Sequence, residues 1–327
     1  MAPADDDISI EEKRVYAGSA GRTDAYVATG DGLVRVAVSG DKIGSFELVA
    51  DVAATDVAVC EGSTAADAAD HSAPVLAVAT DTDLLVAALA VDGANRSGTA
   101  DPDLQPVGFG PTAAVGVYDD AFLVAGADGT VARVDPDVET DADAEPQPEE
   151  DAPPTPTPIG TVSDPRAVDG PLVAAADGVH RIVKRRTDDG ATLQSVGLDD
   201  AADVAGSGVP LAATPEGVYW LGNGWMDALT GDASRVAADG DGHAMTVIDE
   251  ELYVRGDDTA GSWDADAWTA TTLPVAESPV ALGYGPGISA VVTAAGTLCL
   301  DAGDGWRHQV IGFRNANAVA LTPAIDG

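Results

Sequence analysis

Short apolar runs separated by Gly- and Asp-rich turns recur along the whole chain. The stretch Ala25–Val38 (AYVATGDGLVRVAV) has an apolar run, a Gly-Asp-Gly turn, and a second run in which apolar and polar residues alternate. Alternation with a period of two residues, bounded by turn formers, predicts a β-hairpin. Helical periodicity is essentially absent from the sequence. The pattern therefore predicts an all-β protein.

The hairpin occurs in seven versions, and their turn residues run from Gly32 to Gly296 in six steps that average 44 residues. A repeat of roughly 40–50 residues is typical of a four-stranded propeller blade. The other six versions are Val75–Leu89, Ala121–Asp135, Pro171–Lys184, Val209–Gly222, Glu251–Asp264 and Ile288–Asp301.

A short strand of small apolar residues precedes most hairpins, and a more polar strand such as Phe46–Ala50 follows. Small residues suit the innermost strands, where blades crowd around a central axis. The predicted inner strands are Asp56–Cys60, Thr112–Tyr118, Arg166–Asp169, Asp203–Gly206, Ala244–Ile248 and Pro279–Tyr284. The pattern thus predicts a seven-bladed β-propeller of four-stranded antiparallel blades.

The two ends of the chain indicate how the ring closes. The last hairpin and its outer strand are followed by one more inner-type strand, Asn317–Thr322, whereas only Val15–Gly18 precedes the first hairpin. We expect the C-terminal strand to complete the first blade, because circular closure removes free sheet edges. Whether Val15–Gly18 competes for that position or adds at an edge stays open.

One domain accounts for nearly all of the sequence. Residues 1–13 form an acidic N-terminal tail, and residues 14–327 form the propeller. The insertion Pro136–Pro158 is rich in proline and acids and almost devoid of apolar residues, which predicts a disordered loop between a hairpin and its outer strand.

The charge balance is strongly acidic, with 55 acids against 16 bases and a net charge of −39. Such a surface repels nucleic acid and attracts cationic partners. Dense carboxylates also keep a protein hydrated in concentrated salt, and we favour this halophilic interpretation because acids occur in every segment and only three lysines are present. No basic region followed by an apolar stretch opens the chain, so we expect a cytoplasmic protein.

One uncharged window, Ser278–Leu300, has the length of a membrane span. Its glycines and prolines stand at turn spacing, so it is better interpreted as two strands and a loop. We expect no membrane association and a monomeric protein.

The motifs of common enzyme classes are missing. The sequence has no HExxH, CxxC, GxSxG or phosphate-loop motif, and its four histidines are scattered over different repeats. Cys60 and Cys299 each lie in an apolar run without a second cysteine nearby, which predicts buried, unpaired thiols. The sequence predicts no catalytic residue, no metal site and no cofactor.

Binding residues are expected where loops converge at one opening of the propeller. The large, non-acidic residues in those loops suit an anionic small molecule or a peptide carboxylate. These candidates are Phe109, Arg166, His243, Phe313, Arg314, Asn315 and Asn317. Phe109 and Phe313 follow glycine at the same register of the repeat, and packing between blades is the alternative role for both.

A basic cluster ends the fourth hairpin, at Arg181, Lys184, Arg185 and Arg186. Ion pairing with nearby acids such as Asp188 and Asp189 is one interpretation, and a docking point for an acidic partner is the other. No aromatic residue interleaves the cluster, which argues against nucleic acid.

The hairpin sequences AYVATGDGLVRV and AFLVAGADGTVARVD resemble the repeats of quinoprotein-type propellers. The tryptophan-docking motif of that family is missing here, as is its quinone or calcium site, so the resemblance implies the fold and not the catalysis. Over its length the chain is similar to haloarchaeal cytoplasmic propeller proteins without assigned activity.

Two functions remain open from the sequence. The first is a non-enzymatic scaffold that binds a protein partner through the loops of one propeller face. The alternative is a small-molecule-binding or hydrolytic propeller with an axial pocket for an anionic ligand. Inner strands rich in Ala and Val offer few converging polar groups for catalysis, which favours the scaffold.

Overall fold

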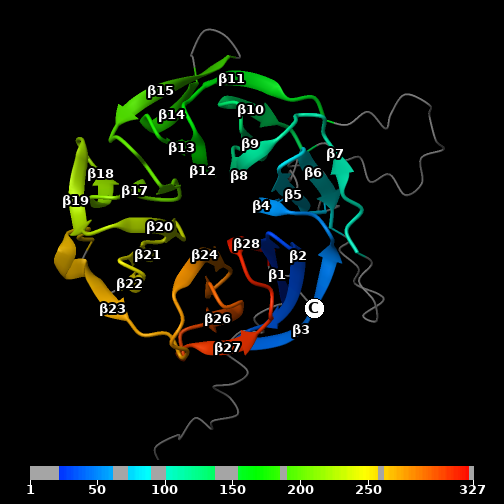
Figure 1. Cartoon of the computed structure of the whole chain (residues 1–327). Coiled ribbons are helices and arrows are strands. Elements are labelled where there is room, and N and C mark those ends of the chain that lie inside the picture. The colour runs from blue at the N-terminus through cyan, green and yellow to red at the C-terminus, as the bar shows by residue number, and fades with distance from the viewer. Residues whose placement is uncertain are drawn as a thin grey trace, which may run out of the picture.

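The computed structural model describes residues 22–61, 73–89, 101–136, 154–184, 190–256 and 261–323. Seven four-stranded antiparallel sheets surround a central axis as the blades of a propeller (Figure 1). The blades, each given from its inner to its outer strand, are as follows. Blade 1 contains β28 (Ala316–Leu321), β1 (Arg22–Thr29), β2 (Gly32–Ser39) and β3 (Lys42–Ala50), and blade 2 contains β4 (Ala54–Cys60), β5 (Val75–Thr80), β6 (Leu84–Ala88) and β7 (Gln105–Pro106). Blade 3 contains β8 (Thr112–Tyr118), β9 (Ala121–Gly126), β10 (Thr130–Val134) and β11 (Thr157–Thr161); blade 4 contains β12 (Pro165–Asp169), β13 (Leu172–Ala175), β14 (Gly178–Lys184) and β15 (Ala191–Gly197). Blade 5 contains β16 (Asp203–Ala205), β17 (Leu211–Thr214), β18 (Gly217–Leu221) and β19 (Trp225–Thr230); blade 6 contains β20 (Ala233–Ala238), β21 (Ala244–Ile248), β22 (Glu251–Arg255) and β23 (Trp268–Thr271); blade 7 contains β24 (Pro279–Gly285), β25 (Ile288–Thr293), β26 (Thr297–Asp301) and β27 (Arg307–Val310).

The C-terminal strand closes the first blade, as the sequence predicts. In Figure 1, red β28 lies beside blue β1, and Val319 pairs with Val27 in the antiparallel register. Two side-chain hydrogen bonds continue this pairing beyond the strands. Thr23 Oγ1 donates to the carbonyl of Thr322 at 2.7 Å, and the Asp24 amide donates to Thr322 Oγ1 at 2.9 Å. The prediction of a seven-bladed, circularly closed propeller is therefore confirmed.

Two sequence predictions fall mainly outside the described residues. The acidic tail 1–13 and the segment Val15–Gly18 lie there entirely, so their role in closure stays a prediction. Most of the insertion Pro136–Pro158 lies there too, and its last two residues belong to β11.

The antiparallel order of the strands gives the propeller two distinct faces. The turn between the second and third strands of each blade and the connection to the next blade lie on one face, here called the hairpin face. Connections between the first and second strands and between the third and fourth lie on the opposite face, here called the loop face. Every candidate binding residue can be placed by this rule.

The strand assignment predicted for blade 6 is wrong. Ala244–Ile248 is the second strand, β21, and the inner strand is β20, which precedes it. The central hairpin is therefore β21–β22, turning at Asp249 and Glu250, which both have positive φ. The inner strand escaped detection because Arg235 interrupts its run of small residues.

The repeated turn glycine has a packing role. At Gly178, φ is +106°, and a Cβ atom would overlap the carbonyl oxygen of Leu198 in the connection to blade 5. Asp83 replaces this glycine in blade 2, and its carboxylate accepts the amides of Gly108, Phe109 and Gly110 at 2.8–3.1 Å. A glycine in blade 4 and an aspartate in blade 2 thus both allow the hairpin turn to contact the connection to the next blade.

The hydrophobic core is divided into seven clusters, one between each pair of neighbouring blades. Fully buried Phe122, for example, belongs to the cluster between blades 2 and 3, and Met245 to that between blades 6 and 7. Cys60 and Cys299 are buried and unpaired in these same two clusters, which confirms the prediction for both thiols. No helix in the described residues has the length and apolarity needed to cross a membrane.

Candidate functional site

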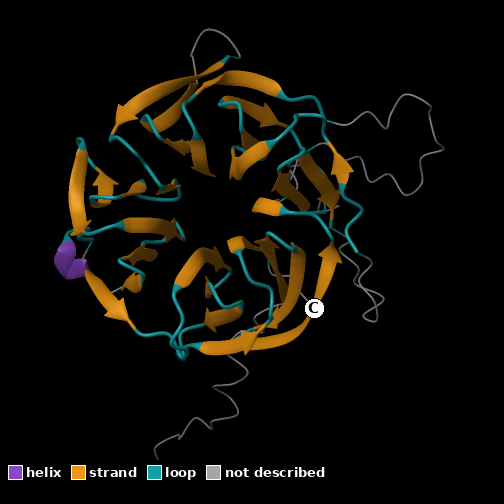
Figure 2. Ribbon diagram, in the orientation of Figure 1, coloured by secondary structure: helices purple, strands orange, loops and turns teal. Residues whose placement is uncertain are grey.

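The inner strands of all seven blades line a channel of about 1270 Å³ along the propeller axis. Figure 2 shows these strands as an inner ring, with the outer strands at the rim. About half of the residues that line the channel are Ala, Val or Gly, so the polar side chains among the others define its chemistry. Those polar groups are the first candidates for a functional site.

Three of them form an equivalent set at the hairpin-face end of the channel. Asn317 Nδ2 donates to the carbonyl of Ala54 at 2.8 Å, and Thr55 Oγ1 donates to the carbonyl of Thr112 at 3.0 Å. Arg166 Nη1 donates to the carbonyl of Ala201 at 3.3 Å. Each donor occupies the extra residue of a bulge near the start of an inner strand and reaches the next blade.

Two half-buried carboxylates make a similar contact with the next blade from the inner strands. Asp56 accepts the amide of Val57 at 2.8 Å and that of Val115 in blade 3 at 2.9 Å. Asp203 accepts the amides of Val204 and, in blade 6, of Val236 at 2.9 and 3.0 Å.

Two further residues also bond across a blade interface. Asp169 Oδ2 accepts the amide of Gly206 at 2.6 Å, and Arg235 Nε donates to the carbonyl of Val280 at 2.9 Å. Seven side chains of the inner strands thus bond the neighbouring blade, and we call them clasps: Thr55, Asp56, Arg166, Asp169, Asp203, Arg235 and Asn317.

Desolvation dominates the ionisation of the clasp carboxylates. Burial raises the pKa of Asp56 to about 7 and that of Asp203 to about 6, although the amides that they accept act in the opposite direction. The Arg235 guanidinium also lowers the pKa of Asp203. Perturbed carboxylates are common at active sites, but these two bond backbone amides of the next blade.

The described residues include no cluster of three or more His, Cys, Asp or Glu side chains placed to hold a metal ion. Burial raises the pKa of the Cys60 thiol to about 11 and that of Cys299 to about 12, which keeps both protonated and unreactive at neutral pH.

The sequence-predicted residues of the mouth divide between packing and clasping. Phe109 and Phe313 lie on the hairpin face, and both are half-buried against the cores between blades. Arg314 and Asn315 are exposed on the same face, where the Asn315 carbonyl accepts the amide of Gly30 in the neighbouring turn. Arg166 also pairs with Asp200 at 2.7 Å.

His243 lies apart from the other six predicted residues. It belongs to the connection between β20 and β21, so it is on the loop face at the opposite end of the channel. Its Nδ1 lies 2.5 Å from Asp239 Oδ2, and its amide donates to Asp239 Oδ1 at 3.0 Å. The error in blade 6 explains the misplacement, since it reversed the face assigned to this loop.

The predicted basic cluster is only partly within the described residues. Lys184 ends β14 on the loop face, forms an ion pair with Asp119 of blade 3, and lies 5.8 Å from the Tyr118 ring centroid. Arg181 is exposed on the same strand. Arg185 and Arg186 lie outside the described residues, so docking at this cluster stays a prediction.

The clasps formed by Asp56, Asp203 and Arg235 are absent from the sequence-predicted site. Their signal in the sequence is a charged residue at the start of a run of small apolar residues, as in DVAVC and RVAA. A charge in so crowded a position needs a partner, and only the three-dimensional arrangement identifies that partner as the next blade.

Residues 9–322 match the family model described as an HVO_0234-like beta propeller. The chain belongs to the HVO_0234-like β-propeller family. The family name agrees with the resemblance to haloarchaeal propellers seen in the sequence. The comparison with curated proteins gave no match.

The chain is similar to several solved structures at low sequence identity. The structure of YCF48 bound to a D1 peptide aligns with a TM-score of 0.50 and 14% identity, covering 80% of this chain and 84% of that one. A structure of AztD from Citrobacter koseri aligns with a TM-score of 0.47 and 9% identity, covering 92% and 98%. Human WBSCR16 aligns with a TM-score of 0.42 and 14% identity, covering 71% and 74%.

Proposed function

We propose that this propeller is a non-enzymatic scaffold that binds a protein partner through its loop face. The observation that carries the proposal is the role of the polar channel residues. Asp56, Asp203 and Arg235 bond the next blade, so these groups stiffen the ring and do not converge on a substrate. A stiff ring is a suitable platform for presenting loops to a partner.

Connection lengths favour the loop face. The longest gaps in sequence between strands that end and begin on this face are residues 61–74, 89–104 and 135–156, most of which lie outside the described residues. Connections between blades on the hairpin face are short, for example residues 51–53 and 162–164. Because loop length and composition determine specificity on a conserved framework, we place partner recognition on the face with the long connections.

The charge of the chain favours a cationic or neutral protein surface as the partner. A net charge of −39 repels nucleic acid and anionic lipid headgroups, so neither is proposed as a ligand. We further propose that the protein works as a monomer in the cytoplasm of a halophile. YCF48, which shares the fold, was solved with a peptide, so the fold is compatible with peptide binding.

The axial site for an anionic small molecule receives less support. Arg166 was its main cationic candidate at the hairpin face, and this side chain already pairs with Asp200 and bonds the Ala201 carbonyl. Asn317 is engaged with Ala54, and His243 lies at the other end of the channel. The predicted residues therefore do not form one binding mouth.

The test compares two matched charge reversals in a pull-down from cells at high salt. D101K/D304K changes two exposed loop-face residues, and D31K/D81K changes two exposed hairpin-face residues. We expect a stoichiometric partner with the wild type and with D31K/D81K, and its loss with D101K/D304K. Loss with only the hairpin-face variant, or no protein partner with the wild type, would contradict the proposal.

A further inference from the structure

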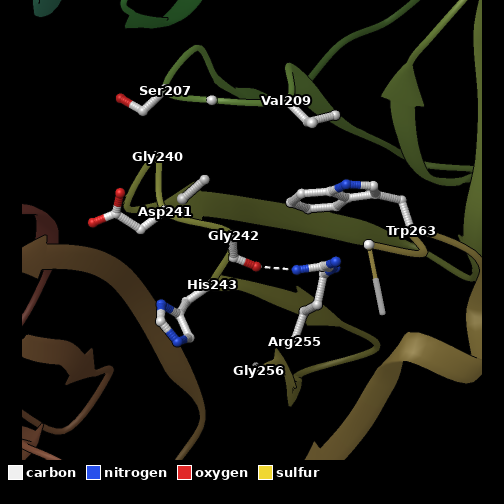
Figure 3. A pocket seen from close by; sticks show the side chains of 12 residues that line it. Ser207, Val209, Gly240, Asp241, Gly242, His243, Arg255, Gly256 and Trp263 are labelled. Atoms are coloured by element: carbon white, nitrogen blue, oxygen red, sulfur yellow. Dashed lines mark hydrogen bonds between the residues drawn. The ribbon is translucent and has the colours of Figure 1, made fainter. Parts of the chain in front are cut away.

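A second cavity, of about 450 Å³, opens on the loop face between blades 5 and 6. Its walls are the β16–β17 connection around Ser207, the β20–β21 connection around Gly242, and the described residues Arg255, Gly256, Gly261 and Trp263 (Figure 3). Arg255 and Trp263 form one end of the cavity, and Asp241 lies at the other.

Arg255 is held rigidly in this wall. The residue is only 3% exposed, its Nε donates to the carbonyl of Ser262 at 2.8 Å, and its Nη1 donates to the carbonyl of Gly242. The guanidinium carbon lies 3.9 Å from the centroid of the Trp263 ring. Trp263 is in turn fixed by an edge-on contact with Trp268, at 6.4 Å between ring centroids.

The charge of Arg255 has no counterion among the described residues. The other buried arginine, Arg35, forms an ion pair with Glu47, whereas no described carboxylate lies within ion-pairing distance of Arg255. Burial lowers the pKa of Arg255. A buried cation is costly unless an anion compensates it, so this position favours an anionic ligand.

Glycines keep the space beside the guanidinium open. Gly208, Gly240, Gly242, Gly256 and Gly261 all line the cavity. A Cβ atom on Gly242 would lie 3.5 Å from Arg255 Nη1, and one on Gly256 or Gly261 would meet no atom of the described residues within 4 Å. The walls beside Arg255 are therefore largely backbone, and the guanidinium borders the cavity through the small part of its surface that is exposed.

We propose that this cavity binds a small organic carboxylate, whose two oxygens pair with the free N–H groups of Arg255. A guanidinium has five N–H donors in a planar fork, and two of those of Arg255 already reach carbonyl oxygens. The remaining donors match a carboxylate in geometry and charge. Trp263 and Val209 give the ligand an apolar wall, which favours an acid with a compact apolar body.

The test measures binding of benzoate in concentrated KCl, with benzamide as the neutral control of the same shape. We expect saturable quenching or enhancement of tryptophan fluorescence and a higher melting temperature with benzoate only. R255K keeps the positive charge but removes the planar fork, so its affinity should fall about tenfold or more. R307K changes an exposed arginine paired with Asp41 and should bind benzoate like the wild type.

Two results would overturn the proposal. One is an equal response of the wild type to benzoate and benzamide, which needs no variant to be folded. The other is unchanged benzoate affinity in a folded R255K protein. Because the cavity is assayed without any protein partner, its failure leaves the scaffold proposal standing, and the reverse also holds.

Discussion

At the scale of single residues, the repeats share contacts between each hairpin turn and the connection to the next blade. The sequence shows the recurring turn residues but not the groups that they contact. The recurring turn identified six of the seven central hairpins, because glycine fits where the turn meets the connection to the next blade; the hairpin of blade 6 turns at Asp249 and Glu250 instead. At Gly178 the backbone has φ of +106° and faces the Leu198 carbonyl. Asp83 fulfils the same role by accepting three amides.

Replacing Gly178 with alanine should therefore destabilise the fold. The new Cβ atom needs both a left-handed backbone and displacement of the Leu198 carbonyl, so we expect a loss of at least about 2 kcal/mol. Gly224→Ala is the matched control, since its Cβ would meet no atom within 4 Å, and it should change stability by less than about 1 kcal/mol. Denaturant unfolding at high salt measures both; equal effects would refute the packing role.

The clasp carboxylates Asp56 and Asp203 should make the stability of the fold depend on pH. Burial raises the pKa of Asp56 in the folded state to about 7, above its value in the unfolded chain, so the folded protein binds that proton more tightly. This contribution to stability is complete below the unfolded-state pKa and is lost as the pH rises through about 7. Asp203, with a pKa of about 6, acts in the same direction.

We expect the free energy of unfolding to fall between about pH 4 and about pH 7, and the fall to be smaller in Asp56→Asn. Asp31→Asn, at an exposed turn, should follow the wild-type curve. Chemical denaturation at constant high salt gives the three curves. Identical slopes for D56N and the wild type would show that Asp56 does not carry this dependence.

At the scale of strands and blades, small apolar composition located six of the seven inner strands. It failed at β20, where Arg235 breaks the pattern because its guanidinium bonds the Val280 carbonyl of blade 7. The same error placed His243 on the wrong face. The sequence also identified Arg166 and Asn317 as unusual polar residues, but it could not show that their partners are Ala201 and Ala54 on the next blades.

The closing strand β28 should be indispensable to the ring. It supplies the inner strand of blade 1, and Thr322 beside it bonds both Thr23 and Asp24. Truncation before Arg314 should abolish cooperative unfolding at high salt. Truncation after Pro323 removes only the last four residues and should leave the transition unchanged. A stable, cooperative product of the first truncation would contradict circular closure.

At the scale of the whole molecule, the net charge of −39 sets the conditions under which the fold is stable. Self-repulsion among so many carboxylates opposes a compact state, and salt screens it over a Debye length of about 3 Å at 1 M and about 10 Å at 0.1 M. Neither the clasps nor the cores between blades neutralise this excess, because the described ion pairs involve only a few of the acids.

We therefore predict that the protein unfolds on dilution from molar to low salt. The melting temperature should rise steeply with KCl concentration, and the dependence should weaken in variants with fewer exposed acids. Circular dichroism across a salt series measures it. A melting temperature that does not change with salt would exclude the halophilic interpretation of the charge.

The Arg255–Trp263 cavity was not predicted from the sequence. Its residues come from two blades, and in the sequence Arg255 and Trp263 are isolated residues among glycines and acids that form no recognisable motif. Their common signal is the dense spacing of glycines at 240, 242, 256 and 261, which turn prediction explains equally well. Only the three-dimensional structure brings the guanidinium, the indole and the open space together.

The central claim is that a stiff, closed propeller presents its loop face to a protein partner. Hydrogen exchange of the protein with and without the captured partner tests it most directly. We predict added protection in loop-face connections such as 119–120, 239–243 and 302–306, and no change in the hairpin-face segments 30–31, 81–83 and 311–315. Protection confined to the hairpin-face segments would contradict the claim.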